Sequence, residues 1–375
     1  MSKEIYDVYY STGGGSLVGG GADVWVNHWI ENIAPKLKVK PKLLIHRTKP
    51  RGKTRIEVEH EQKVKFEKSV NAGRGGNPGR VVHKKIKKSY MDIFKNELEH
   101  HWQGEDKQKF RDLLDGARRI HLLHAYYSPH AYIVNNMDKI HSNIVHMSVR
   151  DMLKASVFLD LKHSYHTYAE ESWEDTMCEN IKHPIWIGVD EKKLKHPMKH
   201  IPNFYEFKHN LDVVDSNTIG YAARMETRKC PHFMEGLDSM LFTTNSGIRW
   251  WKKYQNLDTS TWKIYSYNPL FVEKFYKRDD WGISHSAHIY EPFGYSIFQA
   301  VDFGKIPILA HDWLPNYDYP LRASSVKEFR SQYERICKMG LDERRDILFP
   351  LREYLNEKYG NKEEWVENML RIYND

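Results

Sequence analysis

The sequence predicts an α/β protein of two domains, and three observations support this prediction. The chain has 375 residues, which is long enough for two domains of ordinary size. A β-rich run at residues 5–10 is followed by two glycine clusters and a helix-like pattern, which is typical of the opening of a Rossmann-like unit. Residues 285–313 resemble a loop, a helix and a buried strand in succession, which adds a second α/β unit near the other end.

The N-terminal half alternates between strand-like and helix-like runs. After the glycine clusters at 13–15 and 19–21, apolar residues recur at helical spacing up to residue 33. The glycine loop departs from the dinucleotide fingerprint, so we predict no nicotinamide site. The elements expected next are strands at 42–45, 119–124, 140–147 and 185–190 and a helix at 89–114. A polar segment with prolines at 192–210 is the expected domain boundary.

Two cations follow the next expected strand, at residues 218–224. Arg224 ends this strand, and Lys229 comes five residues later, before a helix that Pro231 is expected to open. Both would lie at the carboxyl edge of a parallel sheet, where they could neutralise a leaving diphosphate. The alternative is a pair of ordinary surface cations. Later elements are expected at 264–267 (strand) and at 271–276, 325–339, 342–359 (broken near Pro350) and 363–372 (helices).

The stretch at 285–313 places an acid ahead of a helix. Glu291 leads into a Pro-Phe-Gly turn that ends at Gly294, and a helical pattern begins at Tyr295. Gly304 suits a left-handed helix terminus, and residues 306–310 are expected to form a buried strand. The free N–H groups of that helix would favour a phosphate beside Glu291. The alternative is a plain helix–strand unit with a solvated glutamate.

Composition and cysteine usage limit the class of protein. Hydrophobic residues make up 40% of the chain and aromatic residues 13%, which is enough for packed cores and excludes global disorder. No run approaches the roughly 18–20 apolar residues of a membrane span, so we expect no stable membrane insertion. The first residues favour a strand over a signal peptide. Three widely separated cysteines (Cys178, Cys230 and Cys337) indicate a reducing cytoplasm without a structural zinc site.

The positive charge of the chain is concentrated in one segment. Between residues 46 and 90 there are 14 Lys or Arg and four Glu, so this segment carries +10 while the rest of the +7 chain carries −3. A partner that bears phosphates is the natural inference, although a solvated basic surface is the alternative. The side chains expected to bind nucleic acid are Arg74, Arg80, Lys84, Lys85, Lys87 and Lys88.

The order of these motifs resembles that of retaining glycosyltransferases with the GT-B fold. The glycine loop, a Gly-Val-Asp sequence at 188–190, the Arg224/Lys229 pair and the Glu291 loop occur in that family's order. The resemblance implies two Rossmann-like domains facing across a cleft, at 1–200 (acceptor-binding, with a basic insertion at about 46–90) and 201–350 (donor-binding). It also implies that a C-terminal helix at 351–375 crosses back to the first domain.

The resemblance also implies which residues hold a nucleotide-sugar, expected to be linked to UDP. Gln299 stands where the family has a second glutamate, and its amide oxygen can accept a hydrogen bond from a ribose hydroxyl without carrying charge. Cys230 stands where a glycine usually follows the lysine. The expected donor-binding set is Gly20, Gly21, Arg224, Lys229, Glu291, Phe293, Gly294, Tyr295 and Gln299.

Catalytic side chains are expected at strand ends of the N-terminal half. The candidates there are His124, His130, His146 and Asp151, of which His146 and Asp151, together with Glu291, form the expected catalytic set. We expect no metal and no cofactor besides the nucleotide-sugar substrate. The resemblance implies retention of the anomeric configuration.

For the acceptor, the basic segment favours DNA, as in phage DNA α-glucosyltransferases that modify hydroxymethylcytosine. Holding a hydroxymethylated pyrimidine of double-stranded DNA at a cleft would require phosphate contacts. The protein would then be a monomer of the cytoplasm, or of the host cytoplasm if phage-encoded. Two alternatives stay open: a cytoplasmic glycosyltransferase of lipid-linked or envelope polysaccharide synthesis, and a non-catalytic nucleic-acid-binding protein.

Overall fold

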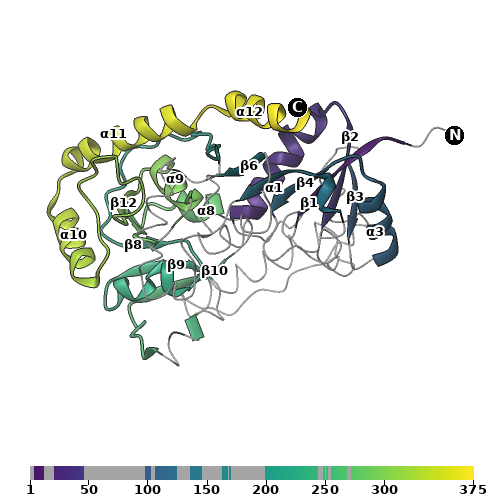
Figure 1. The fold of residues 1–375 in the computed structure, drawn as a ribbon. Coiled ribbons are helices and arrows are strands. Elements are labelled where there is room, and N and C mark those ends of the chain that lie inside the picture. The colour runs from purple at the N-terminus through teal and green to yellow at the C-terminus, as the bar shows by residue number, and fades with distance from the viewer. Residues whose placement is uncertain are drawn as a thin grey trace, which may run out of the picture. The chain divides into compact units, whose positions relative to one another are not determined.

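The chain folds into two compact α/β units, each built around its own sheet (Figure 1). The computed structural model describes residues 4–11, 21–45, 98–102, 106–124, 136–145, 163–167, 169, 199–243, 248–249, 251, 255–267, 272–289, 291 and 293–375. Within these ranges, the residues up to Phe204 and the terminal segment Lys362–Asp375 form unit 1. Tyr205–Asn361 form unit 2.

Unit 1 contains a seven-stranded parallel sheet in the order β3-β2-β1-β4-β5-β6-β7. The run β3-β2-β1-β4-β5 is the strand order of a Rossmann-like unit, with the switch point between β1 and β4. The strands are β1 Tyr6–Ser11, β2 Lys40–Ile45, β3 Glu99–Trp102, β4 Ile120–His124, β5 Ile140–Val145, β6 His163–His166 and β7 Lys199–His200. Its helices are α1 Gly21–Asn32, α3 Lys107–Gly116 and α12 Lys362–Asn374, with 3-10 turns η1 Ala34–Lys36 and η2 Met137–Lys139.

The last helix of the chain belongs to the core of unit 1. Successive residues of a strand point to opposite faces, so Tyr9 packs against α1 and α12 while Val8 and Tyr10 pack against α3. On the α12 side, Tyr373 lies edge-on to Tyr9 with ring centroids 5.2 Å apart. The chain therefore returns to its first unit at its C-terminus, as the resemblance implied (Figure 1).

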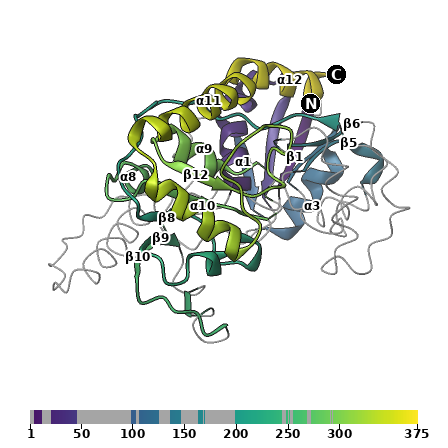
Figure 2. The same ribbon diagram turned by 90° about the vertical axis from the view of Figure 1, so that its left-hand side faces the viewer.

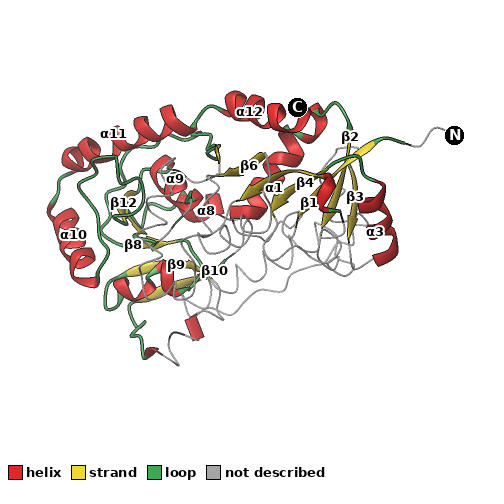
Figure 3. Cartoon of the chain, in the orientation of Figure 1, coloured by secondary structure: helices red, strands yellow, loops and turns green. Residues whose placement is uncertain are grey.

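Unit 2 has a five-stranded parallel sheet in the order β10-β9-β8-β11-β12, again with one switch point. The strands are β8 Ile219–Tyr221, β9 Ser239–Thr243, β10 Trp262–Ser266, β11 Ile283–Ser286 and β12 Ile306–Leu309. The helices are α8 Val272–Tyr276, α9 Tyr295–Asp302, α10 Val326–Lys338 and α11 Leu341–Tyr359, with 3-10 turns η5 Thr227–Lys229 and η6 Pro231–Met234. Helices α9, α10 and α11 all contact β12, and strands and helices alternate along this unit (Figures 2 and 3).

Three expected elements differ from the structure. The helix expected at 89–114 contains strand β3 instead, and α3 starts only at Lys107, where the Asp106 carboxylate accepts hydrogen bonds from the N–H groups of Gln108 and Lys109. Pro231 opens the 3-10 turn η6 rather than an α-helix. Helix α11 continues through Pro350. Packing of its buried side chains against α9 and β12 outweighs the loss of the one backbone hydrogen bond that a proline cannot donate. The strand expected at 185–190 lies outside the described residues.

In the described part of the chain, no helix is both long and apolar enough to span a membrane.

Candidate functional site

The candidate site lies at the point where the strand order in the sheet of unit 2 reverses. Strands β8 and β11 are neighbours in parallel register, with Ile219 opposite Ile283, and they are the two strands on either side of the switch point. Loops that leave the carboxyl ends of such strands diverge, which opens the crevice where α/β proteins usually bind ligands. The loop after β8 carries Arg224 and η5, and the loop after β11 leads to Glu291 and α9.

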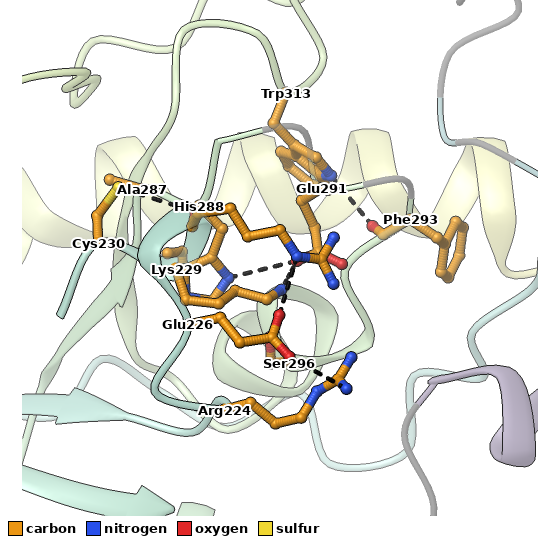
Figure 4. A network of polar contacts seen from close by, with 12 residues as sticks. Arg224, Glu226, Lys229, Cys230, Ala287, His288, Glu291, Phe293, Ser296 and Trp313 are labelled. Atoms are coloured by element: carbon orange, nitrogen blue, oxygen red, sulfur yellow. Dashed lines mark hydrogen bonds and ion pairs between the residues drawn. The ribbon is translucent and has the colours of Figure 1, made fainter. Parts of the chain in front are cut away.

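A buried ion pair joins these two loops. The ammonium of Lys229 contacts Oε2 of Glu291, and the two side chains are only 10% and 13% exposed (Figure 4). Cys230 directly after Lys229 adopts a left-handed conformation with φ 47° and ψ 44°, which ends η5 and starts η6. Burial, assisted by Arg228 and Arg224, lowers the pKa of Lys229 well below its ordinary value, while the charge of Glu226 acts in the opposite direction.

Two arginines share a second carboxylate beside this pair. Glu226 Oε1 lies 3.1 Å from Arg224 Nη1 (Figure 4). Glu226 Oε2 accepts a hydrogen bond of 3.0 Å from Arg228 Nε. Although burial opposes ionisation, Arg224 and Arg228 lower the pKa of Glu226 below its usual value. The side chain of Arg224 is 63% exposed, so its guanidinium is accessible to a ligand. The loop thus presents three cations and one acid within six residues.

Two buried histidines, His285 and His288, lie close to the Lys229–Glu291 pair. Nδ1 of His288 lies 3.5 Å from Oε2 of Glu291, and burial together with the charge of Lys229 lowers the pKa of His288 well below its usual value. Burial lowers the pKa of His285 to about 4. Its Nδ1 accepts a hydrogen bond from the N–H of Ala287, so the proton is on Nε2, which donates to the carbonyl of Cys230 at 2.9 Å.

The turn before α9 needs its glycine. Gly294 has φ +81°, and a Cβ there would come within 2.8 Å of Cδ1 of Ile297 and 3.0 Å of Cγ of Glu291. Gly294, the residue before α9, has no side chain that could cap the helix, and its carbonyl accepts a hydrogen bond from the N–H of Ile297. The geometry therefore keeps Glu291 and the positive end of α9 side by side.

Not every expected donor-binding side chain is directed toward this cluster. Phe293 is buried, stacks on Phe298 at 4.4 Å, and accepts a hydrogen bond through its carbonyl from Nε1 of Trp313. Its ring points away from the Lys229–Glu291 pair (Figure 4). Phe293 is therefore a packing residue, which positions the turn through the core. Tyr295 and Gln299 are partly exposed and lie on the first two turns of α9.

The structure brings together Arg224, Lys229, Glu291 and Gly294, and it adds three residues that sequence reasoning missed. Glu226 and Arg228 fall inside the Arg224–Lys229 step, and His288 precedes Glu291 by three residues. The only signal in the sequence was this proximity to recognised motifs. In the part of the chain that the structure describes, no group of three His, Cys, Asp or Glu side chains could hold a metal ion.

Other expected site residues belong to unit 1 or are not described. Gly21 is the first residue of α1, and His124 is the last residue of β4. The remaining ones lie outside the described residues: Gly20, His130, His146, Asp151, Arg74, Arg80, Lys84, Lys85, Lys87 and Lys88.

Comparison with known proteins gives a fold but no close relative: no family model and no curated protein match the sequence. Among solved structures, a sucrose-phosphate synthase from Thermosynechococcus elongatus has a TM-score of 0.60 at 12% identity, covering 98% of both chains. The pneumococcal O-GlcNAc transferase GtfA, solved with UDP and GlcNAc, has a TM-score of 0.57 at 10% identity, covering 99% of this chain and 100% of that one. An α-glucosyltransferase, solved with UDP and a 13-mer DNA containing an HMU base, has a TM-score of 0.54 at 11% identity, covering 99% of this chain and 100% of that one.

These similarities extend over nearly the whole chain and agree with the two parallel sheets of the structure. The fold class expected from the sequence is confirmed: the chain has the GT-B fold of glycosyltransferases, with two Rossmann-like domains.

Proposed function

We propose that the protein is a glycosyltransferase that uses a UDP-sugar and binds its diphosphate at the switch point of unit 2. The observation that carries this proposal is the buried Lys229–Glu291 pair between the loops after β8 and β11. A buried ion pair contributes little to stability, so its presence at a ligand-binding edge favours a functional role. The glycosyltransferase fold gives independent support.

In this proposal, the cations act on the leaving group. The bond between the anomeric carbon and the diphosphate oxygen breaks while a bond to the acceptor oxygen forms, and the acceptor proton passes to the departing phosphate or to a nearby base. Negative charge then grows on the diphosphate, where Arg224, Lys229 and the N-terminus of α9 stabilise it. Glu291, freed from Lys229, would bind sugar hydroxyls. Retention of the anomeric configuration is part of the proposal. So are catalytic roles for His146 and Asp151 and donor-binding roles for Gly20 and Gly21.

As acceptor we propose a hydroxymethylated pyrimidine in double-stranded DNA. The support is the +10 segment at residues 46–90 together with the likeness to an α-glucosyltransferase that was solved with DNA. The substitution of Gln299 for an acid favours a second candidate, a nucleic-acid-binding protein without catalysis. A lipid-linked or polysaccharide acceptor is the third possibility that the experiment separates.

The test is transfer of radiolabelled sugar from a panel of UDP- and GDP-sugars. The acceptors are duplex DNA with hydroxymethylcytosine, the same duplex unmodified, and a lipid-linked acceptor. We expect label from a UDP-sugar in the hydroxymethylated DNA alone. Label in the lipid fraction would replace the DNA acceptor, and tight DNA binding without transfer or donor binding would establish the non-catalytic candidate.

A further inference from the structure

We propose that His288 is a positioning residue that holds the Glu291 carboxylate when a diphosphate draws Lys229 away from it. The inference rests on the proposed function, and it assigns a role to a histidine within the site. Both Lys229 and His288 are directed at the same oxygen of Glu291 (Figure 4).

The burial of His288 makes its lack of partners informative. The residue is 1% exposed, and within the described part of the chain neither ring nitrogen has a hydrogen-bond partner. An unsatisfied buried polar group is costly and calls for an explanation, and a ligand-bound state that satisfies the group supplies one. A carboxylate oxygen, Oε2 of Glu291, lies 3.5 Å from Nδ1 of His288. A shift of roughly 0.6 Å would bring the two atoms to ordinary hydrogen-bond length.

The surroundings of His288 keep its ring neutral and set its tautomer. Its charged neighbours are Lys229, Arg228 and Glu291, and its titratable ring neighbours are Tyr221 and His285, with centroids 5.9 and 5.6 Å away. Burial and the two cations oppose a second proton on the imidazole. A neutral imidazole has one N–H, and the carboxylate in front of Nδ1 favours the tautomer that donates from this atom.

The need for a second holder of Glu291 follows from charge. In the free protein the Lys229 ammonium balances the Glu291 carboxylate. A diphosphate carries more charge than a carboxylate, so it competes for that ammonium and leaves Glu291 in a largely buried position without its cation. Its pKa would then rise, and a protonated or displaced Glu291 would no longer accept hydrogen bonds from the sugar. A hydrogen bond from Nδ1 of His288 favours the ionised carboxylate in its original place.

The experiment compares His288→Leu, which removes the donor, with His288→Asn, whose amide nitrogen can replace Nδ1. The matched control is His209→Leu, a histidine of the same unit that packs on Phe303. For each protein we would measure UDP affinity by calorimetry. We would also measure kcat and KM for UDP-glucose, or for the UDP-sugar selected by the panel, through donor hydrolysis and transfer, as a function of pH.

We expect His288→Leu to bind UDP about threefold to tenfold more weakly than wild type, because the diphosphate of UDP draws Lys229 from Glu291 and the carboxylate then lacks a hydrogen-bond donor. Its kcat should fall by about tenfold or more, in line with the loss of a positioned group, and the acid limb of its kcat profile should move to higher pH. His288→Asn should recover most of both, and His209→Leu should match wild type.

Two results would overturn the inference while leaving the proposed function in place. One is a His288→Leu enzyme with unchanged kcat and pH profile. The other is an equal decrease in UDP affinity and in melting temperature in His288→Leu and His288→Asn, which would indicate that His288 acts only as a packing residue. Absence of UDP binding and turnover in the wild-type protein would instead remove the proposed function, and the inference with it.

Discussion

At the scale of single residues, the site is a set of charges that the fold partly neutralises. Glu226 bridges Arg224 and Arg228, and Glu291 neutralises Lys229. In the proposed function, the diphosphate of the donor would compete with these two acids for their cations. Such an arrangement keeps the cations aligned without a ligand, which reduces the cost of organising them when the ligand arrives.

Arg224 gives the cleanest single-residue test of the diphosphate assignment. We expect Arg224→Ala to lower kcat/KM for the UDP-sugar by about 100-fold, which is typical for loss of one charge-stabilising donor. The melting temperature should stay near that of wild type, because Arg224 is 63% exposed and an exposed ion pair is worth about 0–1 kcal/mol. Steady-state kinetics and calorimetry measure both effects.

The control for this variant is Arg371→Ala. Arg371 is also an exposed arginine in one surface ion pair, with Glu367, but it lies on α12 in unit 1. Arg371→Ala should leave turnover unchanged. Normal turnover of Arg224→Ala would contradict the assignment of the diphosphate to this loop.

At the scale of elements, buried carboxylates fix segments that carry no regular structure. Asp302, the last residue of α9, is 1% exposed and accepts hydrogen bonds from the backbone N–H groups of Lys208, His209 and Asn210. The Tyr205 hydroxyl also donates to it, at 3.2 Å. One side chain thereby attaches the first residues of unit 2 to the helix that follows Glu291.

Removal of this carboxylate should destabilise unit 2. We expect Asp302→Ala to lower the free energy of unfolding by at least about 2 kcal/mol, because four part-buried hydrogen bonds lose their acceptor. Denaturant unfolding measures the change, and Asp318→Ala, an exposed aspartate of the same unit, is the control. Equal stability of the two variants would show that the segment finds other acceptors.

A charge cluster on strands β2 and β3 makes the stability of unit 1 depend on pH. Lys40 and Lys42 lie 3.4 and 3.3 Å from Oε2 of Glu99, and His101 lies 2.9 Å from Oε1. Although burial opposes ionisation, His101, Lys42 and Lys40 lower the pKa of Glu99 to about 2. Because the folded pKa is below the unfolded value, the stabilisation is present above about pH 4.5 and is lost as the pH falls toward 2.

We therefore expect Glu99→Gln to be less stable than wild type at pH 7 by about 1 kcal/mol, a value reduced for the 32% exposure of Glu99. The difference should shrink steadily between pH 4.5 and pH 2. Chemical unfolding at several pH values measures it, with Glu367→Gln on the exposed face of α12 as control. A difference that did not change with pH would exclude the ionised Glu99 as its source.

At the scale of the whole molecule, the division of charge bears on the proposed acceptor. The segment at 46–90 carries +10 and the remainder of the chain −3, so a polyanion would be attracted to one part of the sequence. In the proposed donor site, by contrast, Glu226 and Glu291 offset two of the three cations Arg224, Arg228 and Lys229. Acceptor and donor binding should consequently respond differently to salt.

Neutralising Lys84, Lys85, Lys87 and Lys88 together to Gln should weaken DNA binding and flatten its salt dependence. Each lost phosphate contact reduces the slope of log K against log salt by about 0.9, so the reduction can reach about 3.6. UDP affinity should not change. The control replaces four exposed lysines of unit 2, namely Lys263, Lys277, Lys327 and Lys338; an identical slope in both variants would reject the role of the basic segment.

The sequence by itself determined the features that depend on neighbours along the chain. Alternating strand and helix patterns predicted an α/β protein, and the Arg224, Lys229 and Glu291 motifs were recognisable because each is local. Local patterns failed at residues 99–102, where a strand replaced the expected helix, because pairing with β2 outweighed helical spacing.

Only the tertiary structure decided which motifs meet. Lys229 and Glu291 are 62 positions apart and come into contact because β8 and β11 are adjacent in the sheet, an order set by packing across the whole unit. The surroundings of His288 likewise combine Glu291, three residues further along the chain, with Lys229 from the other loop. Strand order and burial are properties of the folded core, so no spacing of residues along the sequence encodes them.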